Sequence, residues 1–233
     1  AQTVPPCTLE ITDAETFARD WTVIDVNSDV SANTWAYNDG NAMYMQDKSN
    51  AADDWLIAPA VTLEAGKAYK VSAYVKHSST FGSDKQKIEL KIGTAPTVEG
   101  LTTRLVYDES FQSRLFVEKS GTFSPAESGV FYVGLRCYSE SYNGDLYFQK
   151  IVIEEAPVYP AQITDLSIVA GERGAMSATL SWTWPSSDHL GGALSNLLGA
   201  KIYRGTDLVA TLDTATVGGK AGWIDSSIET AGN

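Results

Sequence analysis

The sequence contains few positively charged residues, and this shortage limits the partners that the chain can have. Its 17 lysine and arginine residues stand against 29 aspartate and glutamate residues, which gives a formal net charge of -12. Nucleic acids and anionic membrane surfaces bind proteins through clustered basic side chains. The composition therefore argues against both as partners.

Long apolar runs, histidine and cysteine are also scarce. No run of about 18 apolar residues is present, so no membrane insertion is expected. The two histidines, His77 and His189, belong to no metal-binding or nucleophile motif, and the sequence predicts no catalytic residue and no enzyme. The two cysteines, Cys7 and Cys137, fit no metal motif, and both a disulfide and two buried free thiols agree with the sequence.

Signals for helices are almost absent, whereas short strand-like runs recur along the chain. These runs alternate apolar and polar residues or are rich in β-branched residues, and Gly, Pro, Ser and Asn clusters separate them. In the first part of the chain the predicted strands are Trp21–Val26, Ala42–Gln46, Asp54–Ile57, Ala68–Lys76, Gln86–Ile92, Arg104–Tyr107, Arg114–Phe123, Gly129–Tyr138 and Asp145–Ile153. This spacing predicts an all-β fold, an antiparallel β-sandwich.

A proline-bracketed segment, Glu154–Pro160, predicts a domain boundary. It divides the chain into domains 1–155 and 156–233. In the second domain the predicted strands are Ile163–Val169, Ser177–Trp184, Gly199–Arg204, Asp207–Leu212 and Ala221–Ser227. Because an immunoglobulin-type sandwich needs about seven strands, we expect this domain to be incomplete, either because the natural chain continues or because the sequence is a fragment.

An acidic loop after the first predicted strand has the spacing of a cation site. Asp25, Asn27 and Asp29 occupy alternate positions, and the first 64 residues carry eleven acidic residues against two basic ones. Oxygen side chains that converge in this way suit a hard cation such as Ca²⁺. An Asp/Asn turn that bonds its own backbone has the same composition and is the alternative interpretation.

Several aromatic residues lie in or beside predicted loops, where a ring can stack on a sugar. They are Trp35, Tyr37, Tyr44, Tyr107, Tyr138 and Tyr142, and the candidate ligand-binding residues among them are Trp35, Tyr37 and Tyr142. Aromatic side chains also dominate the cores of sandwiches, so a core position is the alternative for each of them.

Three stretches of the first domain resemble the cleaved-adhesin or choice-of-anchor J domains, the jelly rolls of gingipain adhesin regions. The stretches are Trp21–Asp29 followed by Trp35, the block Asp54–Pro59, and the closing segment Gly144–Ile153. The second domain is similar to bacterial fibronectin type III domains. That similarity rests on Leu180–Pro185, Lys201–Thr211 and Gly222–Asp225.

These resemblances imply a jelly roll with a structural Ca²⁺ site, followed by a partial fibronectin type III sandwich. The implied ligands are Asp25, Asn27 and Asp29, with Asp13, Asp54 and Asp145 as further candidates. Asn27 stands where the family usually has aspartate, which lowers the charge of the site.

The family resemblance also implies an exported protein. The chain begins at Ala1 without methionine, as expected after removal of a signal peptide, which predicts a secreted or cell-surface location. We expect a non-enzymatic adhesion or binding module whose partner is a protein or glycan of a host or neighbouring cell. The alternative is a carbohydrate-binding module attached to a larger secreted hydrolase.

Overall fold

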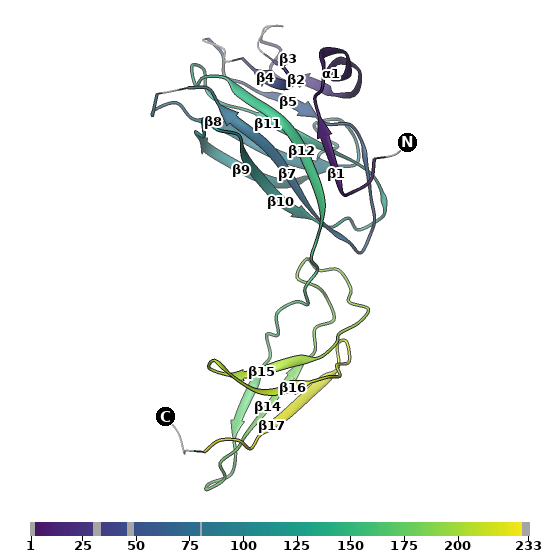
Figure 1. Cartoon of the computed structure of the whole chain (residues 1–233), viewed down its shortest axis with the longest axis vertical. Coiled ribbons are helices and arrows are strands. Elements are labelled where there is room, and N and C mark those ends of the chain that lie inside the picture. Colours follow the sequence, from purple (N-terminus) through teal and green to yellow (C-terminus); the bar gives the residue numbers. More distant parts are fainter. Residues whose placement is uncertain (1–2, 30–33, 46–48, 80, 230–233) are drawn as a thin grey trace. The chain divides into compact units, whose positions relative to one another are not determined.

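The computed structural model describes residues 3–29, 34–45, 49–79 and 81–229, and it divides the chain into two compact units (Figure 1). The first unit is Ala1–Ala156 and the second is Pro157–Asn233. Gln46, in one predicted strand, and residues 30–33, between the acidic loop and Trp35, lie outside the described residues. No helix in the described ranges is long and apolar enough to cross a membrane.

The first unit consists of two six-stranded antiparallel sheets. In one sheet the order is β10 (Val117–Phe123), β7 (Ala68–His77), β12 (Leu146–Ala156), β4 (Asn41–Tyr44) and β3 (Trp35–Asn38), with β1 (Cys7–Glu10) also paired to β12. In the other sheet the order is β2 (Thr22–Asp25), β5 (Asp54–Ile57), β11 (Gly129–Cys137), β8 (Gln86–Gly93) and β9 (Thr103–Phe111), with β6 (Val61–Leu63) also paired to β11. The chain passes repeatedly from one sheet to the other, and the predicted jelly-roll β-sandwich is confirmed.

The core of this unit lies between the inward faces of the two sheets. In β7, Val71, Ala73 and Val75 are fully buried, whereas Lys70 and Lys76, which flank them, are partly exposed. Trp21 meets Phe148 edge to face, with ring centroids 5.3 Å apart. Since successive strand residues point to opposite faces, the alternation in the sequence correctly predicts which side of β7 is buried.

One short helix, α1 (Ala14–Asp20), differs from the prediction of an almost helix-free chain. Asp13 precedes it and accepts a hydrogen bond from the Thr16 backbone N–H at 2.7 Å, which is an N-cap. The helix has no buried residue, so it lacks the apolar periodicity by which helices are recognised in a sequence.

The two cysteines are free thiols, which decides between the two alternatives that the sequence left open. Cys7 lies in β1 of one sheet, whereas Cys137 ends β11 in the other sheet. Burial raises the pKa of the Cys137 thiol to about 12, so this thiol stays protonated and unreactive in the folded protein.

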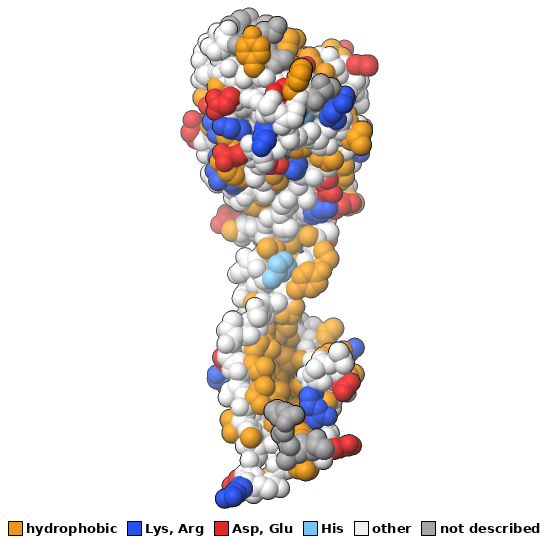
Figure 2. Space-filling view, turned by 90° about the vertical axis from the view of Figure 1, so that its left-hand side faces the viewer, with side chains coloured by type: hydrophobic (Ala, Val, Ile, Leu, Met, Phe, Trp, Pro, Cys, Tyr) orange, Lys and Arg blue, Asp and Glu red, His pale blue; other side chains and the backbone are white. Residues whose placement is uncertain are grey.

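The second unit has a three-stranded sheet and a separate two-stranded sheet. The first contains β13 (Ser167–Ala170), β14 (Ala178–Thr183) and β17 (Lys220–Asp225), and the second contains β15 (Ala200–Arg204) and β16 (Asp207–Leu212). Trp182 and Trp184 are its buried hydrophobic residues. Figure 2 shows hydrophobic side chains gathered along one face of this unit, and Ile168, which pairs with Leu180, is 64% exposed. The fibronectin type III assignment stays a prediction.

Candidate functional site

The acidic residues predicted as cation ligands are brought together in part by the pairing of β2 with β5. Asp25, the last residue of β2, stands directly opposite Asp54, the first residue of β5. The backbone N–H of Val26 donates to the Asp53 carbonyl at 2.9 Å, which holds the acidic loop against the start of β5. Two carboxylates 29 positions apart in the sequence thus share one end of the sheet.

Asp54 is the most unusual residue of this region, because its side chain is fully buried. Its Oδ2 accepts a hydrogen bond from the Asp53 backbone N–H at 3.1 Å, while its Oδ1 has no hydrogen-bond partner among the described residues. Burial raises the pKa of Asp54 to about 7, against the lowering effect of the Thr34 side chain and the Asp53 backbone. The negative charges of Asp25 and Asp29 add to the rise. A buried carboxylate oxygen without a partner is costly, and a cation would satisfy it.

The acidic loop itself makes local side-chain hydrogen bonds of the kind found in Asp/Asn turns. The Ser28 backbone N–H donates to Asp25 Oδ1 at 2.6 Å, and Ser28 has a positive φ of 51°. The Asn27 amide N–H₂ donates to Asp29 Oδ2 at 3.2 Å and to the Ala51 carbonyl at 2.7 Å. These bonds hold Asn27 and Asp29 near the segment that leads into β5. The geometry therefore agrees both with a turn that bonds its own backbone and with a cation site.

The further candidate Asp13 has a different role. Besides the Thr16 backbone N–H, its carboxylate accepts hydrogen bonds from the Thr12 and Thr16 hydroxyls, each at 3.0 Å. The hydrogen bond from the Thr16 N–H is the largest of the causes that lower the pKa of Asp13. Asp13 is therefore the N-cap of α1, and its role as a metal ligand stays a prediction.

The Asp13→Ala variant is expected to melt at a lower temperature than the wild type, because the first turn of α1 loses its capping acceptor. Its response to Ca²⁺ is expected to be unchanged. Thermal unfolding followed by circular dichroism, with and without Ca²⁺, measures both effects, and Asp13→Asn is the control because asparagine also caps helices. A lost calcium response in Asp13→Ala would return this residue to the metal site.

Asp145 lies just before β12, in the sheet that does not contain Asp54. Its backbone N–H donates to the Ser78 hydroxyl at 2.8 Å, and its carbonyl accepts from the Ser78 N–H at 2.9 Å. Within the described ranges, no three His, Cys, Asp or Glu side chains form a metal-holding group. A cation beside Asp54 would therefore also need amide or backbone carbonyl oxygens, which Ca²⁺ accepts readily.

The three predicted ligand-binding aromatics occupy three different environments. Trp35 is 2% exposed, packs edge to face on Tyr44 and donates from Nε1 to the Asp54 carbonyl at 3.2 Å. The prediction for Trp35 is thus corrected, because a core ring cannot stack on a sugar. Tyr37 packs partly buried against the core, whereas Tyr142 is 61% exposed with a φ of 63°.

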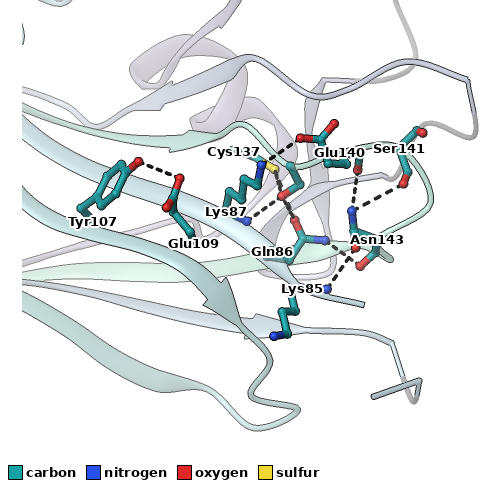
Figure 3. A network of polar contacts seen from close by, with 10 residues as sticks. Lys85, Gln86, Lys87, Tyr107, Glu109, Cys137, Glu140, Ser141 and Asn143 are labelled. Carbon is teal, nitrogen blue, oxygen red and sulfur yellow. Dashed lines mark hydrogen bonds and ion pairs between the residues drawn. The ribbon is translucent and has the colours of Figure 1, made fainter. Parts of the chain in front are cut away.

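Tyr142 is carried by a loop that a buried polar network fixes (Figure 3). Gln86 is 1% exposed, and its side-chain N–H₂ donates to the carbonyls of Asn143 at 3.0 Å and Gly144 at 2.6 Å. Its Oε1 accepts from the Ser139 hydroxyl at 2.5 Å. These bonds anchor both ends of the loop that presents Tyr142.

A second candidate site lies on the outward side of the sheet that contains β5, β11, β8 and β9. The strand registers align Trp55, Arg136, Glu89 and Tyr107 in one row across these strands. The next residues along three of these strands, Leu56, Leu135 and Leu90, lie in the core, so the row points the other way. We call this row, together with Lys87, Lys91, Arg104, Tyr138 and the acids that pair with them, the polar sheet face.

Glu89 is the centre of the polar sheet face. Its side chain is 2% exposed and contacts three cations, Arg104 Nε at 2.6 Å, Arg136 Nη1 at 3.5 Å and Lys91 Nζ at 3.6 Å. Arg136 Nε also pairs with Asp53 Oδ1 at 2.7 Å. A buried carboxylate with this many partners fixes the positions of the side chains around it.

Two tyrosines extend the polar sheet face. The rings of Tyr107 and Tyr138 are stacked, with centroids 6.0 Å apart and an interplanar angle of 22°. The Arg104 guanidinium lies 4.6 Å from the Tyr107 centroid, and that of Arg136 lies 5.0 Å from the Tyr138 centroid. Sequence reasoning named both tyrosines among the rings that can stack on a sugar, but it did not join them to the charged residues of this face. The alternation of Lys87, Glu89 and Lys91 marks the outward face of β8. The arginines that pair with Glu89 come from other strands, which the alternation does not reveal.

No family model matches the chain, and no curated protein matches it. Among solved structures, a cleaved adhesin domain of Lys-gingipain from Porphyromonas gingivalis is 12% identical, with 62% of this chain and 97% of that chain covered and a TM-score of 0.48. Another cleaved adhesin domain of the same protein is 14% identical, with 65% and 99% covered and a TM-score of 0.45.

A third similar structure holds the CBM22-1 and GH10 modules of a Clostridium thermocellum endo-1,4-beta-D-xylanase in complex with xylohexaose. It is 16% identical, with 65% of this chain and 28% of that chain covered and a TM-score of 0.42. The cleaved adhesin domains, which the sequence resembles, are thus among the similar solved structures.

Proposed function

We propose that this chain is a non-catalytic, exported binding module whose first unit is stabilised by Ca²⁺ beside Asp54. The observation that carries the proposal is the fully buried Asp54 carboxylate, whose Oδ1 has no hydrogen-bond partner in the described part of the chain. Asp25 stands opposite it, and the charge of Asp29 acts on it. Three carboxylates in mutual repulsion are the arrangement that a divalent cation stabilises.

The residues present fit Ca²⁺ by the chemistry of their donor atoms. Asp25 and Asp54 would supply carboxylate oxygens and Asn27 an amide oxygen, all of them hard ligands, while Asp29 would add a negative charge nearby. The bound ion would neutralise the acidic loop and join it to the start of β5. Its role in this proposal is structural, because it would fix a loop at one end of the sandwich.

An adhesion or binding role, with a protein or glycan of a host or neighbouring cell as partner, is the function that this proposal assigns to the chain. Two features support a binding module over an enzyme. The two histidines are in different units, and each contacts a backbone group nearby: His77 contacts the Asn143 carbonyl, and the His189 ring lies 3.3 Å from the Tyr159 carbonyl. The buried acid Asp54, which could otherwise suggest acid–base chemistry, would be accounted for by the proposed cation.

Thermal unfolding of the metal-stripped protein, with and without Ca²⁺, tests the proposal. For a site with a dissociation constant of about 1 mM, 10 mM Ca²⁺ would stabilise the folded state by about 1.4 kcal/mol. The expected result is a rise of several degrees in the melting temperature of the first unit. Mg²⁺ at the same concentration is the control and is expected to act more weakly, since it demands a stricter geometry. An unchanged melting temperature with Ca²⁺ would contradict the proposal.

A further inference from the structure

The polar sheet face has the organisation of a ligand site. Its central carboxylate, Glu89, is fixed by three cations on three strands, β8, β9 and β11. The Tyr107 hydroxyl donates to Glu109 at 2.7 Å, and Lys87 pairs with Glu140 at 2.8 Å (Figure 3). Polar groups held in this way on strands lose little conformational freedom when they bind a ligand.

The charges of this face balance, in contrast to the chain as a whole. Four cations, Lys87, Lys91, Arg104 and Arg136, accompany four acids, Asp53, Glu89, Glu109 and Glu140, and the ion pairs join every cation to one of these acids. The whole chain has a net charge of -12. A charged ligand would find its opposite charges already paired here, so the face suits a neutral ligand that uses many hydrogen bonds.

The aromatic residues of the face add an apolar surface next to these polar groups. Tyr107 is 50% exposed and lies on β9, which is an edge strand. Its ring is stacked with Tyr138 and contacts Arg104, so it is held in a fixed orientation. A fixed, half-exposed tyrosine offers both a ring for stacking and a polar hydroxyl to the same ligand.

We propose that the polar sheet face binds a neutral saccharide, whose apolar ring face would lie against Tyr107 and whose hydroxyls would bond to the paired charged groups. This inference rests on the proposed function, because it names the ligand class of the binding module. A sugar ring combines an apolar face with a hydroxyl rim, which matches an aromatic residue beside closely spaced donors and acceptors.

Affinity electrophoresis of the whole chain in Ca²⁺-containing gels tests this inference. The gels contain neutral polysaccharides (xylan, mannan or a β-glucan) or the acidic polymers alginate and heparin. The expected result is retardation by at least one neutral polymer and none by the acidic ones. Retardation by the acidic polymers alone, or by none of the polymers, would overturn the inference.

Variants of Tyr107 locate the site. Tyr107→Ala is expected to weaken binding to the retarding polymer at least about tenfold, and Tyr107→Phe by no more than about threefold, because it keeps the ring. Tyr107→Leu, which keeps apolar bulk on the edge strand, is made in parallel and is expected to lose binding like the alanine variant. Tyr203→Ala is the matched control, since Tyr203 is 55% exposed in the second unit.

Equal losses in Tyr107→Ala and Tyr203→Ala would overturn the assignment of the site. The same would follow if both Tyr107→Ala and Tyr107→Leu bound like the wild type. If no polymer binds while Ca²⁺ still raises the melting temperature, the saccharide inference fails and the calcium-stabilised module stands. If a polymer binds while Ca²⁺ leaves the melting temperature unchanged, the saccharide inference stands and the calcium-stabilised module fails.

Discussion

The Asp54→Asn variant is expected to be more stable than the wild type in metal-free buffer at pH 8 and to show no rise in melting temperature with Ca²⁺. At that pH the wild-type carboxylate is ionised, although it is fully buried and faces the charges of Asp25 and Asp29. Asparagine has no charge to bury, so the variant avoids this penalty. It also lacks the charge that would hold Ca²⁺. The variant should therefore gain stability in metal-free buffer and lose the stabilisation that Ca²⁺ gives.

The pH dependence of the metal-free protein provides the second part of this prediction. The pKa of Asp54 is raised from its ordinary value of 3.8 to about 7 in the folded state. The unfolded chain therefore loses its proton first, and this group lowers the free energy of unfolding as pH rises from about 4 to about 7. The loss amounts to a few kcal/mol, at about 1.4 kcal/mol per pKa unit, and it levels off above pH 7. The Asp54→Asn variant should lack this decline.

Calcium should reverse that dependence, because it binds the ionised carboxylate. The calcium-induced rise in melting temperature is expected to be small at pH 5 and largest at pH 8. Calorimetry of the wild type and Asp54→Asn at both pH values measures all of these effects. Asp39→Asn is the control, since Asp39 is exposed in the turn between β3 and β4 with a φ of 44°, a conformation that asparagine tolerates.

Two outcomes would contradict the prediction. One is a calcium response in Asp54→Asn equal to that of the wild type, which would place the cation elsewhere. The other is an Asp54→Asn variant that is less stable than the wild type in metal-free buffer at pH 8. That result would mean that the carboxylate is satisfied within the protein and needs no cation.

The Gly93→Ala variant is expected to lose about 3 kcal/mol of stability or more, the upper range for a steric clash in a packed region. A Cβ atom at Gly93 would lie 1.8 Å from the Gly100 carbonyl oxygen and 2.8 Å from the Leu101 Cα. Both are backbone atoms, so no side-chain rotation relieves the clash. The segment after β8 folds back on this glycine and packs Leu101 against Trp55, which belongs to the polar sheet face.

Thermal unfolding of Gly93→Ala should show a fall on the order of ten degrees for a domain of this size. Gly129→Ala is the matched control, because Gly129 is also a strand glycine of the first unit and a Cβ there would meet no atom within 4 Å. Its stability should change by no more than about 0.5 kcal/mol. If Gly93→Ala and Gly129→Ala have the same melting temperature, the close approach of Gly100 to β8 is not required by the fold.

Much of the fold could be predicted from the sequence, because strand alternation and turn residues are local signals. The predicted strands at Asp54–Ile57 and Asp207–Leu212 have the bounds that the structure gives to β5 and β16. The helix α1 and the short strands β1 (Cys7–Glu10), β3 (Trp35–Asn38) and β6 (Val61–Leu63) were missed, since a short segment carries too little periodicity to be recognised. Whether Cys7 and Cys137 form a disulfide could not be decided from their spacing in the sequence. A disulfide depends on the distance between two strands, and the sequence does not give that distance.

The candidate sites divide in the same way. The sequence by itself determined the all-β fold and the acidic loop with Asp25, Asn27 and Asp29, since each depends on residues close together in the chain. Only the tertiary structure decided that Asp54 is buried opposite Asp25, that Trp35 belongs to the core, and that Glu89 meets Arg136. Strand alternation fixes the face on which a side chain lies, but the order of the strands in the sheet decides which side chains meet there.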